Sequence, residues 1–352
     1  MNLDDVGRIS ALDKDGMLAK IEALPGQLEN AWRLGADLPL PAWKDLRQVI
    51  LCGMGGSAIG ADLVAHYAQP SARAALHVWR GYDLPPWARG PETLVVACSH
   101  SGNTEETLTA FEAARANGTQ IAAITTGGEL AKRARGAGAV LWTFEHAGPP
   151  RAAVGFSFGL TLALLWRCGL VPDPSKEIEE AVAAMRSQQQ AFGAAVPAVH
   201  NPAKRMGGQF MDRWPLLFGA GLTAPVARRW RTQMNELAKA GGSFEELPEA
   251  NHNVVSGVVQ PAGVAQRIMV VCLRAPLDDP RLVRRLDATR HIFMVEGFNT
   301  DAVDGVGDNR LAQQWTCLHY GDYAAFYLAM AYGLDPTPIP AIESLKDQLA
   351  RG

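Results

Sequence analysis

The sequence predicts an α/β protein with two domains, each a parallel sheet flanked by helices in a doubly wound arrangement. Short apolar runs alternate with helical patterns along most of the chain. Such alternation favours right-handed crossovers and parallel sheets, with a ligand crevice at the carboxyl ends of the strands. The chain has 352 residues, which is enough for two such domains with complete cores.

The first half supplies the clearer set of elements. Residues 1 to about 45 are predicted to be mainly helical, because leucine and alanine recur at helical intervals. The predicted strands that follow span 48–52, 75–79, 93–98, 120–125 and 138–144. The predicted helices between them span 57–67, 104–117 and 129–136. Two consecutive prolines, Pro149 and Pro150, end this pattern before longer predicted helices at 152–170 and 176–196.

The second half repeats the pattern in a more divergent form. Its predicted strands span 215–220, 243–247, 267–273 and 291–296. Its predicted helices span 223–241, 280–288, 310–333 and 340–350. We therefore expect a first domain over residues 1–170, which includes the N-terminal helices, and a second over residues 171–352, which includes a linker helix and the C-terminal helices.

Composition excludes several classes of partner. Lysine and arginine total 33 against 36 acidic residues, so no general basic surface for nucleic acid is expected. The sequence lacks an 18-residue apolar span, and its acidic start is unlike a signal peptide, so we expect a cytoplasmic protein without a membrane partner. The five cysteines form no Cys-x-x-Cys pair and the eight histidines show no ligand spacing. Both observations predict buried thiols in a reducing compartment and no metal site.

Two loops rich in glycine, serine and threonine are the most informative part of the chain. They are Gly53-Met54-Gly55-Gly56-Ser57 and Ser99-His100-Ser101-Gly102-Asn103-Thr104. Each follows a predicted strand and opens a predicted helix, so backbone N–H groups, hydroxyls and a helix dipole can all face a phosphate. The predicted phosphate ligands are Gly55, Gly56, Ser57, Ser99, Ser101 and Thr104. Two such loops at one sheet edge indicate a phosphorylated small molecule.

The first loop alone has other interpretations. Gly53-x-Gly55-x-x-Ala58 fits a relaxed dinucleotide fingerprint, which expects an acidic residue after the next strand. Arg80 stands there instead, which disfavours NAD, although an NADP site could use an arginine. The loop is not a P-loop, because no Gly-Lys-Ser/Thr follows. The three hydroxyls of the second loop favour a sugar phosphate over a dinucleotide, and a purely structural turn is the remaining alternative.

Both loops together resemble the sugar isomerase (SIS) domain, which has a flavodoxin-like fold. Three further segments make the chain similar to the bifunctional phosphoglucose/phosphomannose isomerases: Pro149–Ala153, Asn235–Lys239 and Pro248–Asn253. The resemblance covers nearly the whole chain, and Lys346 falls where the family keeps a lysine. The chain has Val254 where many relatives carry glutamate, and His100 where an aromatic residue is usual. Neither departure replaces a residue to which the family assigns chemistry, so they bear on substrate preference.

Aldose–ketose isomerisation sets the chemical requirements. One proton moves between C1 and C2 through a cis-enediolate, which needs a base with a pKa of roughly 4–7 and a cation for the developing oxyanion. It also needs an acid/base group for ring opening, but no metal or redox cofactor. Glu236 is the predicted base, and its apolar neighbours would raise its pKa through burial whereas nearby arginines would favour its ionised form. The alternative is an exposed glutamate paired with Lys239 or an arginine.

Arginines gather around this predicted base. Arg228, Arg229 and Arg231 occupy the same predicted helix as Glu236, and we expect at least two of them on a solvated face. Arg151 follows two prolines at a predicted helix start, where a guanidinium held in a stiff turn could stabilise the enediolate oxygens. Its alternative is a surface arginine at a domain junction.

Two further residues complete the predicted catalytic set. His252 lies in a polar loop, and a histidine with a pKa of about 6.5 suits proton transfer to the ring oxygen. The resemblance implies that this histidine reaches the site of the neighbouring subunit in a homodimer; the alternative is a solvent-exposed loop residue. The resemblance also implies a catalytic role for Lys346, although C-terminal helices commonly carry lysines.

The predicted function is isomerisation of glucose 6-phosphate and mannose 6-phosphate to fructose 6-phosphate. A regulatory protein that binds sugar phosphates without chemistry is one alternative, but it normally carries a basic DNA-binding segment and residues 1–45 are acidic. An amino-sugar phosphate isomerase on the same fold is the other. The ranking of glucose against mannose, and the acceptance of a 2-amino sugar, stay open at this stage.

Overall fold

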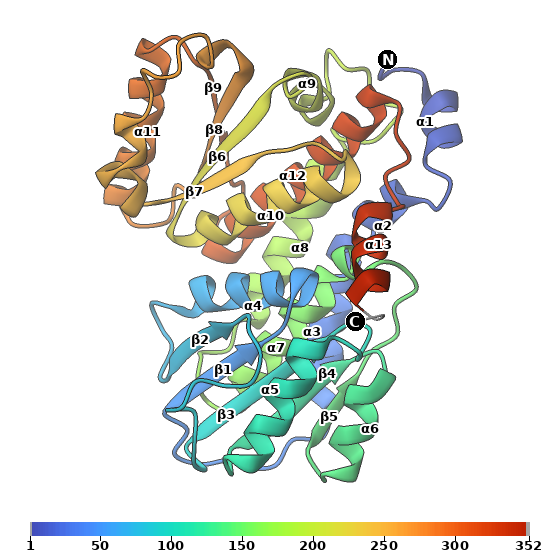
Figure 1. The fold of residues 1–352 in the computed structure, drawn as a ribbon, viewed down its shortest axis with the longest axis vertical. Coiled ribbons are helices and arrows are strands. Elements are labelled where there is room, and N and C mark those ends of the chain that lie inside the picture. Colours follow the sequence, from blue (N-terminus) through green and yellow to red (C-terminus); the bar gives the residue numbers. More distant parts are fainter. Residues whose placement is uncertain (1, 350–352) are drawn as a thin grey trace.

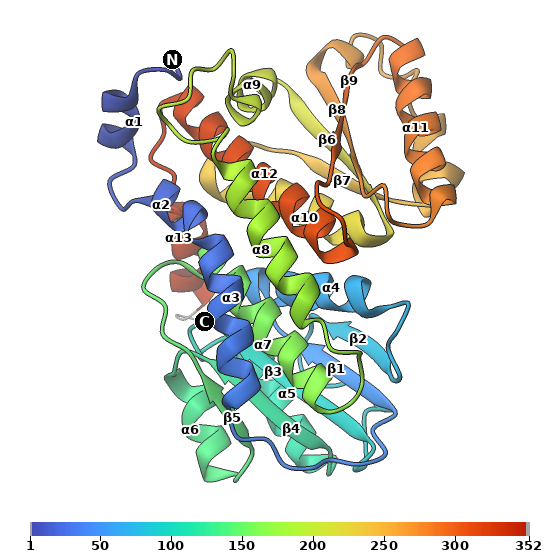
Figure 2. The same ribbon diagram turned by 180° about the vertical axis from the view of Figure 1, so that it is seen from behind.

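The computed structural model describes residues 2–349 and consists of two parallel sheets at opposite ends of the molecule, with helices between and around them (Figures 1 and 2). The first sheet has the order β2-β1-β3-β4-β5, and all its neighbouring strands are parallel. Its strands are Gln48–Cys52 (β1), Ala75–Trp79 (β2), Thr93–Ser99 (β3), Gln120–Thr125 (β4) and Val140–Thr143 (β5). This is the flavodoxin-like order, and it confirms the predicted fold class.

Helices surround this sheet. Three N-terminal helices precede it: Val6–Leu12 (α1), Met17–Glu22 (α2) and Leu24–Asp37 (α3). The crossover and following helices are Gly55–Ala68 (α4), Glu105–Ala116 (α5), Gly128–Gly136 (α6) and Val154–Arg167 (α7), with a 3-10 turn at Pro150–Ala152 (η1). β3 is buried along its whole length, as expected for a central parallel strand. Strand order reverses between β1 and β3, so a ligand crevice is expected at their carboxyl ends.

The second sheet has the order β7-β6-β8-β9, again entirely parallel. Its strands are Trp214–Ala220 (β6), Ser243–Leu247 (β7), Ile268–Arg274 (β8) and Asn299–Asp304 (β9). The helices of this half are Ser175–Gln189 (α8), Pro202–Gln209 (α9), Ala224–Leu237 (α10), Pro280–Val295 (α11), Arg310–Tyr332 (α12) and Pro340–Leu349 (α13). The order matches that of the first four strands of the first sheet, which supports two related domains.

One predicted strand is wrong. The segment 291–296 belongs to helix α11, and the strand that completes the sheet is β9, further along the chain. The apolar run there resembles a strand, but Leu286, Thr289 and Phe293 are buried at helical spacing. The helix ends before Gly297, whose φ of +85° few other residues adopt.

Helix α9 was not predicted, since the sequence placed residues 176–196 in one helix and left the next segment unassigned. α8 ends at Gln189, and α9 begins after Asn201, whose side chain accepts a hydrogen bond from the Lys204 N–H. Gly207 weakens the helical signal but lets α9 approach α12 closely, because a Cβ at Gly207 would lie 2.9 Å from the Leu328 backbone nitrogen. Tertiary packing therefore outweighs local propensity here.

Helix α12 joins the two halves. Almost all of its side chains from Leu311 to Ala331 are buried. The Gln314 side-chain amide donates to the Leu63 carbonyl in α4 (3.2 Å) and to the Leu222 carbonyl before α10 (3.1 Å). Across residues 2–349, no helix combines the length and apolarity that crossing a bilayer requires. The boundary near residue 170 falls between α7 and α8 and stays a prediction, since α8 packs on both α3 and α12.

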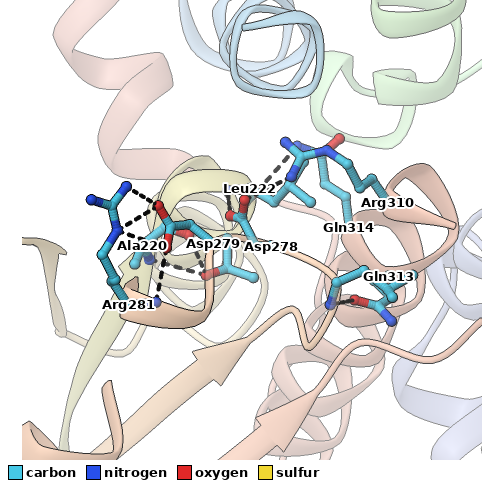
Figure 3. A network of polar contacts seen from close by, with 10 residues as sticks. Ala220, Leu222, Asp278, Asp279, Arg281, Arg310, Gln313 and Gln314 are labelled. Carbon is cyan, nitrogen blue, oxygen red and sulfur yellow. Dashed lines mark hydrogen bonds and ion pairs between the residues drawn. The ribbon is translucent and has the colours of Figure 1, made fainter. Parts of the chain in front are cut away.

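In the second domain, a carboxylate binds the turn that opens onto α10 (Figure 3). Asp278 accepts a hydrogen bond from the Leu222 N–H (2.8 Å), in the 3-10 turn Gly221–Thr223 (η2) that opens onto α10. Its other oxygen accepts from Arg310 (2.7 Å). A Cβ at Gly221 would lie 2.2 Å from the Asp278 carboxylate, so this close approach requires glycine. Asp278 thus stands where the first domain has its predicted phosphate loop.

Loss of the Asp278 carboxylate is expected to destabilise the fold. Asp278→Ala leaves the Leu222 N–H and the Arg310 guanidinium without this acceptor, and should lower the free energy of unfolding by about 1–3 kcal/mol. Urea unfolding followed by circular dichroism measures the change. Asp308→Ala is the control, because it removes the same charge from an exposed position. Equal stability of the two variants would contradict a structural role for Asp278.

Candidate active site

The two predicted phosphate loops lie side by side at the carboxyl ends of β1 and β3, as the parallel register of these strands requires. A Cβ at Gly53 would lie only 2.9 Å from the Cys98 carbonyl oxygen of the neighbouring strand, so the first loop needs glycine there. α4 then begins at Gly55 without a side-chain cap, which leaves its positive end to other partners. Ser57 lies in its first turn and is buried.

The second loop is a tight turn organised by its own hydroxyls. Ser99 Oγ accepts a hydrogen bond from the Gly102 N–H (3.1 Å) and lies 2.9 Å from Thr104 Oγ1. Gly102 has a φ of +69°, and a Cβ there would lie 1.9 Å from the Gly127 carbonyl oxygen. Ser101 Oγ accepts from the Asn103 N–H (3.2 Å) and is exposed. The turn therefore holds three hydroxyls beside the start of α5, whose first turn follows Thr104.

His100 stands where the resemblance leads us to expect an aromatic residue. Its Nε2 lies 3.0 Å from His146 Nδ1, and its ring packs edge-on against Phe144 at 6.0 Å. Burial, with the nearby His146 charge, lowers the pKa of His100 to about 4. A neutral histidine can pack edge-on as an aromatic ring does, so His100 supplies an aromatic contact to Phe144.

Arg151 is buried in the turn η1 and is only 3% exposed. Its Nη2 donates to the carbonyl of Pro336 (3.1 Å) and to that of Thr337, which fixes the guanidinium plane. Burial lowers the pKa of Arg151, while the neighbouring Glu236 opposes that shift. Its Nε has no hydrogen-bond partner among the described residues. This arginine is not the surface residue of the alternative interpretation.

Glu236, in α10, forms an ion pair with Arg151. Glu236 Oε2 lies 3.4 Å from Arg151 Nη1, and the Glu236 side chain is 25% exposed. The pairing joins α10 to a segment 85 residues earlier in the chain, so it is not the local helical pair of the alternative. Lys239 instead donates to the carbonyls of Leu237 and Asp335. The turn η1 also touches α4, because a Cβ at Gly56 would lie 2.6 Å from the Pro150 carbonyl oxygen.

These residues surround a pocket of about 220 Å³ between α4 and α10. Its lining residues are Gly55, Gly56, Ile59, Arg80, Arg151, Arg228, Arg229, Arg231, Thr232, Gln233 and Glu236. The pocket thus combines the N-terminal end of a helix, a carboxylate and a cluster of guanidinium groups.

The expectation that at least two of the three α10 arginines are solvated is wrong. Arg229 is buried against Asp322, with Nε–Oδ1 and Nη2–Oδ2 distances of 3.0 and 2.6 Å. Arg228 and Arg231 are half-buried and line the pocket. The sequence pattern does not identify these three arginines or Arg80 as pocket residues, because α10 turns its basic side toward α4 and not toward solvent. The position of Arg80 directly after the strand Ala75–Trp79, at the carboxyl edge of the sheet, is a sequence feature that could have indicated a place in the pocket.

His252 and Lys346 lie outside this pocket. His252 is exposed on a 3-10 turn, Glu249–His252 (η3), that follows β7 in the second domain. Lys346 is exposed on α13, none of whose described side chains is buried. Val254 is half-buried and packs on the second-domain core. Within one chain, the structure brings Gly55 and Gly56 of the first loop into one pocket with Arg151 and Glu236. The predicted ligands Ser57, Ser99, Ser101 and Thr104 are not among the residues that line this pocket, and His252 and Lys346 lie at the surface.

Residues 199–349 match the family model described as the bacterial phospho-glucose isomerase C-terminal SIS domain. A bifunctional phosphoglucose/phosphomannose isomerase of Caldicellulosiruptor bescii is 35% identical over 338 residues, which cover 95% of this chain and 99% of that protein.

The chain belongs to the bifunctional phosphoglucose/phosphomannose isomerase family.

A second member of this family, from Aquifex aeolicus, is 30% identical over 88% of this chain and 94% of its own length. Among solved structures, a glucose-6-phosphate isomerase like protein from Thermus thermophilus has a TM-score of 0.65, with 19% identity over 96% of this chain and 98% of that chain. At that identity the match supports the SIS fold alone. The similarity to phosphoglucose/phosphomannose isomerases thus extends over both halves of the chain, and the predicted family is confirmed.

Proposed function

We propose that this chain is an aldose–ketose isomerase that interconverts glucose 6-phosphate and mannose 6-phosphate with fructose 6-phosphate. Relatives that are named bifunctional phosphoglucose/phosphomannose isomerases, and that this chain covers almost completely, support the activity. The observation that carries the proposal in the chain itself is the contact between Glu236 and Arg151, 3.4 Å apart beside the first turn of α4. A carboxylate base and a fixed guanidinium at the edge of a phosphate-binding loop are the groups that an enediolate reaction needs.

The substrate phosphate binds the two hydroxyl-rich loops in this proposal. Ser57, Ser99, Ser101 and Thr104 donate hydroxyl hydrogen bonds, and Gly55 and Gly56 present backbone N–H groups at the start of α4. A dianionic phosphate is favoured there by the positive ends of α4 and α5. The sugar then extends from these loops into the pocket that Glu236 and Arg151 line.

Glu236 acts as the base in the proton transfer. Its carboxylate removes the C2 proton of the open-chain aldose phosphate, and the negative charge develops on the C1 oxygen of the resulting cis-enediolate. Arg151 stabilises that charge with a guanidinium already oriented by the Pro336 and Thr337 carbonyls, so little reorganisation accompanies the reaction. Transfer of the O2 hydroxyl proton to O1 and return of the abstracted proton to C1 then give the ketose. The enediolate has lost its configuration at C2, so one base serves both the glucose and the mannose epimer.

Ring opening is assigned to His252, and a homodimer supplies this residue. We infer that His252 of one subunit reaches the pocket of its partner, since His252 is exposed and separate from Glu236 within one chain. Lys346, on the exposed helix α13, is assigned a further catalytic role. We also infer a cytoplasmic location, because the five cysteines are free and all but Cys168 are buried, which fits a reducing compartment.

A coupled assay tests the proposed activity. Purified protein is expected to form glucose 6-phosphate and mannose 6-phosphate from fructose 6-phosphate. Glucosamine 6-phosphate is the comparison substrate for the amino-sugar alternative. A protein that binds fructose 6-phosphate but releases neither aldose would be the non-catalytic regulator, and the proposal would be wrong.

Loss of two loop hydroxyls is expected to weaken substrate binding. Ser101→Ala with Thr104→Ala should raise KM for fructose 6-phosphate far more than it lowers kcat, since each lost hydrogen bond to a charged group corresponds to roughly 1–3 kcal/mol. Steady-state kinetics measures both constants. Thr109→Ala is the control, because Thr109 lies on the same helix but away from its start. An unchanged KM would place the phosphate elsewhere.

A further inference from the structure

The pocket has a second end that the isomerisation does not use. Arg80, at the end of β2, and Arg228, near the start of α10, meet at Asp62 in α4. Glu236 lies eight residues after Arg228, which corresponds to about 12 Å along the axis of α10. The pocket therefore runs along α10 from a reaction end, at Glu236 and Arg151, to an arginine end, at Arg80, Arg228 and Arg231.

Positive charge exceeds negative charge at the arginine end. Asp62 is the shared carboxylate of Arg80, which donates to it, and of Arg228, whose Nε lies 3.6 Å from Oδ2. Arg231 donates to the Asn235 side-chain oxygen (3.1 Å), and no carboxylate of residues 2–349 lies within ion-pair distance of it. Burial, with the Arg228 charge, lowers the pKa of Arg231. The arginine end thus holds three guanidinium groups, of which only those of Arg80 and Arg228 pair with Asp62.

The other charged groups around the pocket are already matched. Arg151 has Glu236, and Arg229 has Asp322. Glu246 in β7 lies 3.7 Å from His66, and the hydrogen bond from His66, with the Arg228 charge, lowers the pKa of Glu246. Even when Glu246 is counted beside Asp62, the three guanidinium groups of the arginine end exceed its carboxylates by one.

The arginines at this end are held in place. The guanidinium groups of Arg228 and Arg231 lie 4.9 and 5.5 Å from the ring centre of Phe244 in β7. Arg80 also donates to the Ala58 carbonyl (3.3 Å). Guanidinium groups ordered by stacking lose little side-chain entropy when an anion binds, and their donor geometry suits phosphate.

We propose that the arginine end is a second anion subsite, and that the pocket binds hexoses phosphorylated at both ends. This inference rests on the proposed function, which places the first phosphate at the hydroxyl loops and C1 of the sugar near Glu236. A substituent on C1 then points along α10 toward Arg231 and Arg228. A hexose 1,6-bisphosphate would bridge both anion sites, and its esterified C1 oxygen prevents ring opening. Such a compound would occupy the site as a competitive inhibitor.

The test compares two unreactive ligands that differ by one phosphate. α-Glucose 1,6-bisphosphate and 1,5-anhydroglucitol 6-phosphate share the 6-phosphate and the ring, and neither can open to an aldehyde. Isothermal titration calorimetry of the wild-type protein at low salt should give a dissociation constant about tenfold or more lower for the bisphosphate, as one added set of charge-assisted hydrogen bonds provides. This advantage should shrink as ionic strength rises.

Variants locate the second phosphate. Arg231→Gln and Arg228→Gln should each reduce the ratio of the two dissociation constants to less than about threefold. Arg281→Gln is the matched charge control, because Arg281 lines a different pocket and pairs with Asp279. It should keep the wild-type ratio. Circular dichroism verifies that each variant is folded.

Three results would overturn the proposal. Equal affinity of the wild-type protein for both ligands would leave no second subsite. A wild-type ratio in both arginine variants would place the second phosphate elsewhere. The third result concerns a dimer that dissociates when Arg231→Gln is introduced, together with equal affinities of the wild-type protein for the two ligands. It would mean that a carboxylate of a second copy neutralises the arginine end. Failure of both ligands to bind would also refute the sugar-phosphate site itself, whereas failure of the bisphosphate advantage alone leaves the proposed isomerase intact.

Discussion

Glu236→Gln is expected to reduce kcat for fructose 6-phosphate isomerisation by a factor on the order of 10²–10⁴, the usual contribution of a general base. Glutamine keeps the shape of the side chain, and its amide oxygen can still face Arg151, so the pocket should keep its form. The carboxylate that accepts the substrate proton is lost. A phosphorylated hydroxamate that mimics the enediolate should therefore bind the variant nearly as well as the wild type, which calorimetry can measure.

Isotope exchange distinguishes this role from a structural one. In deuterium oxide, the wild-type protein should exchange the C2 proton of glucose 6-phosphate with solvent, and Glu236→Gln should lose that exchange in proportion to kcat. Glu296→Gln, an exposed glutamate at the end of α11, is the control and should exchange normally. Exchange at the wild-type rate in Glu236→Gln would show that another group is the base.

Mixing two inactive variants is expected to restore activity if His252 acts on the partner subunit. Glu236→Gln and His252→Ala protein should each be nearly inactive alone. In a hybrid dimer with His252 acting in trans, one site carries both substitutions and the other carries neither. Equal amounts give about half hybrids, each with one intact site, so activity should recover to roughly a quarter of wild type.

The arrangement in cis predicts a different result. Every site in every hybrid would then carry one substitution, and no activity would return. Subunit exchange must be verified, for example with a mass-tagged copy of one variant, before activity is measured. Full exchange without recovery, or a monomer by analytical ultracentrifugation, would contradict a site shared between subunits.

The sequence predicted most of this fold because its signals were local. Strands such as 120–125 were fixed by apolar runs between turn residues, and both phosphate loops by glycine and hydroxyl positions. The error at 291–296 and the missed helix α9 have the opposite cause. Burial of Phe293 against Phe218, and the approach of Gly207 to α12, are long-range packing effects that a short window of sequence does not contain.

The residues of the candidate site likewise fall into those that local sequence predicts and those that depend on long-range packing. Loop residues such as Ser57 and Thr104 could be named from spacing, and Glu236 and Arg151 came from ordered segments of a known family. The inward orientation of Arg228 and Arg231 could not be named, because it depends on which side of α10 faces α4. Several basic residues on one helix usually indicate that this side of the helix faces solvent. In α10 the basic side faces the pocket instead, where Asp62 of α4 pairs with Arg228.

The burial of α12 has a consequence for how substrate enters. Rotating the two halves apart would break both Gln314 hydrogen bonds and would expose buried side chains such as Trp315, whose ring packs edge-on against Phe158 of α7. Each such side chain costs about 1.5–3 kcal/mol to expose, and a ligand of millimolar to micromolar affinity supplies only about 4–8 kcal/mol in all. We therefore expect substrate to bind without a large rotation of the two halves, so that discrimination among sugars depends on the shape of the existing pocket.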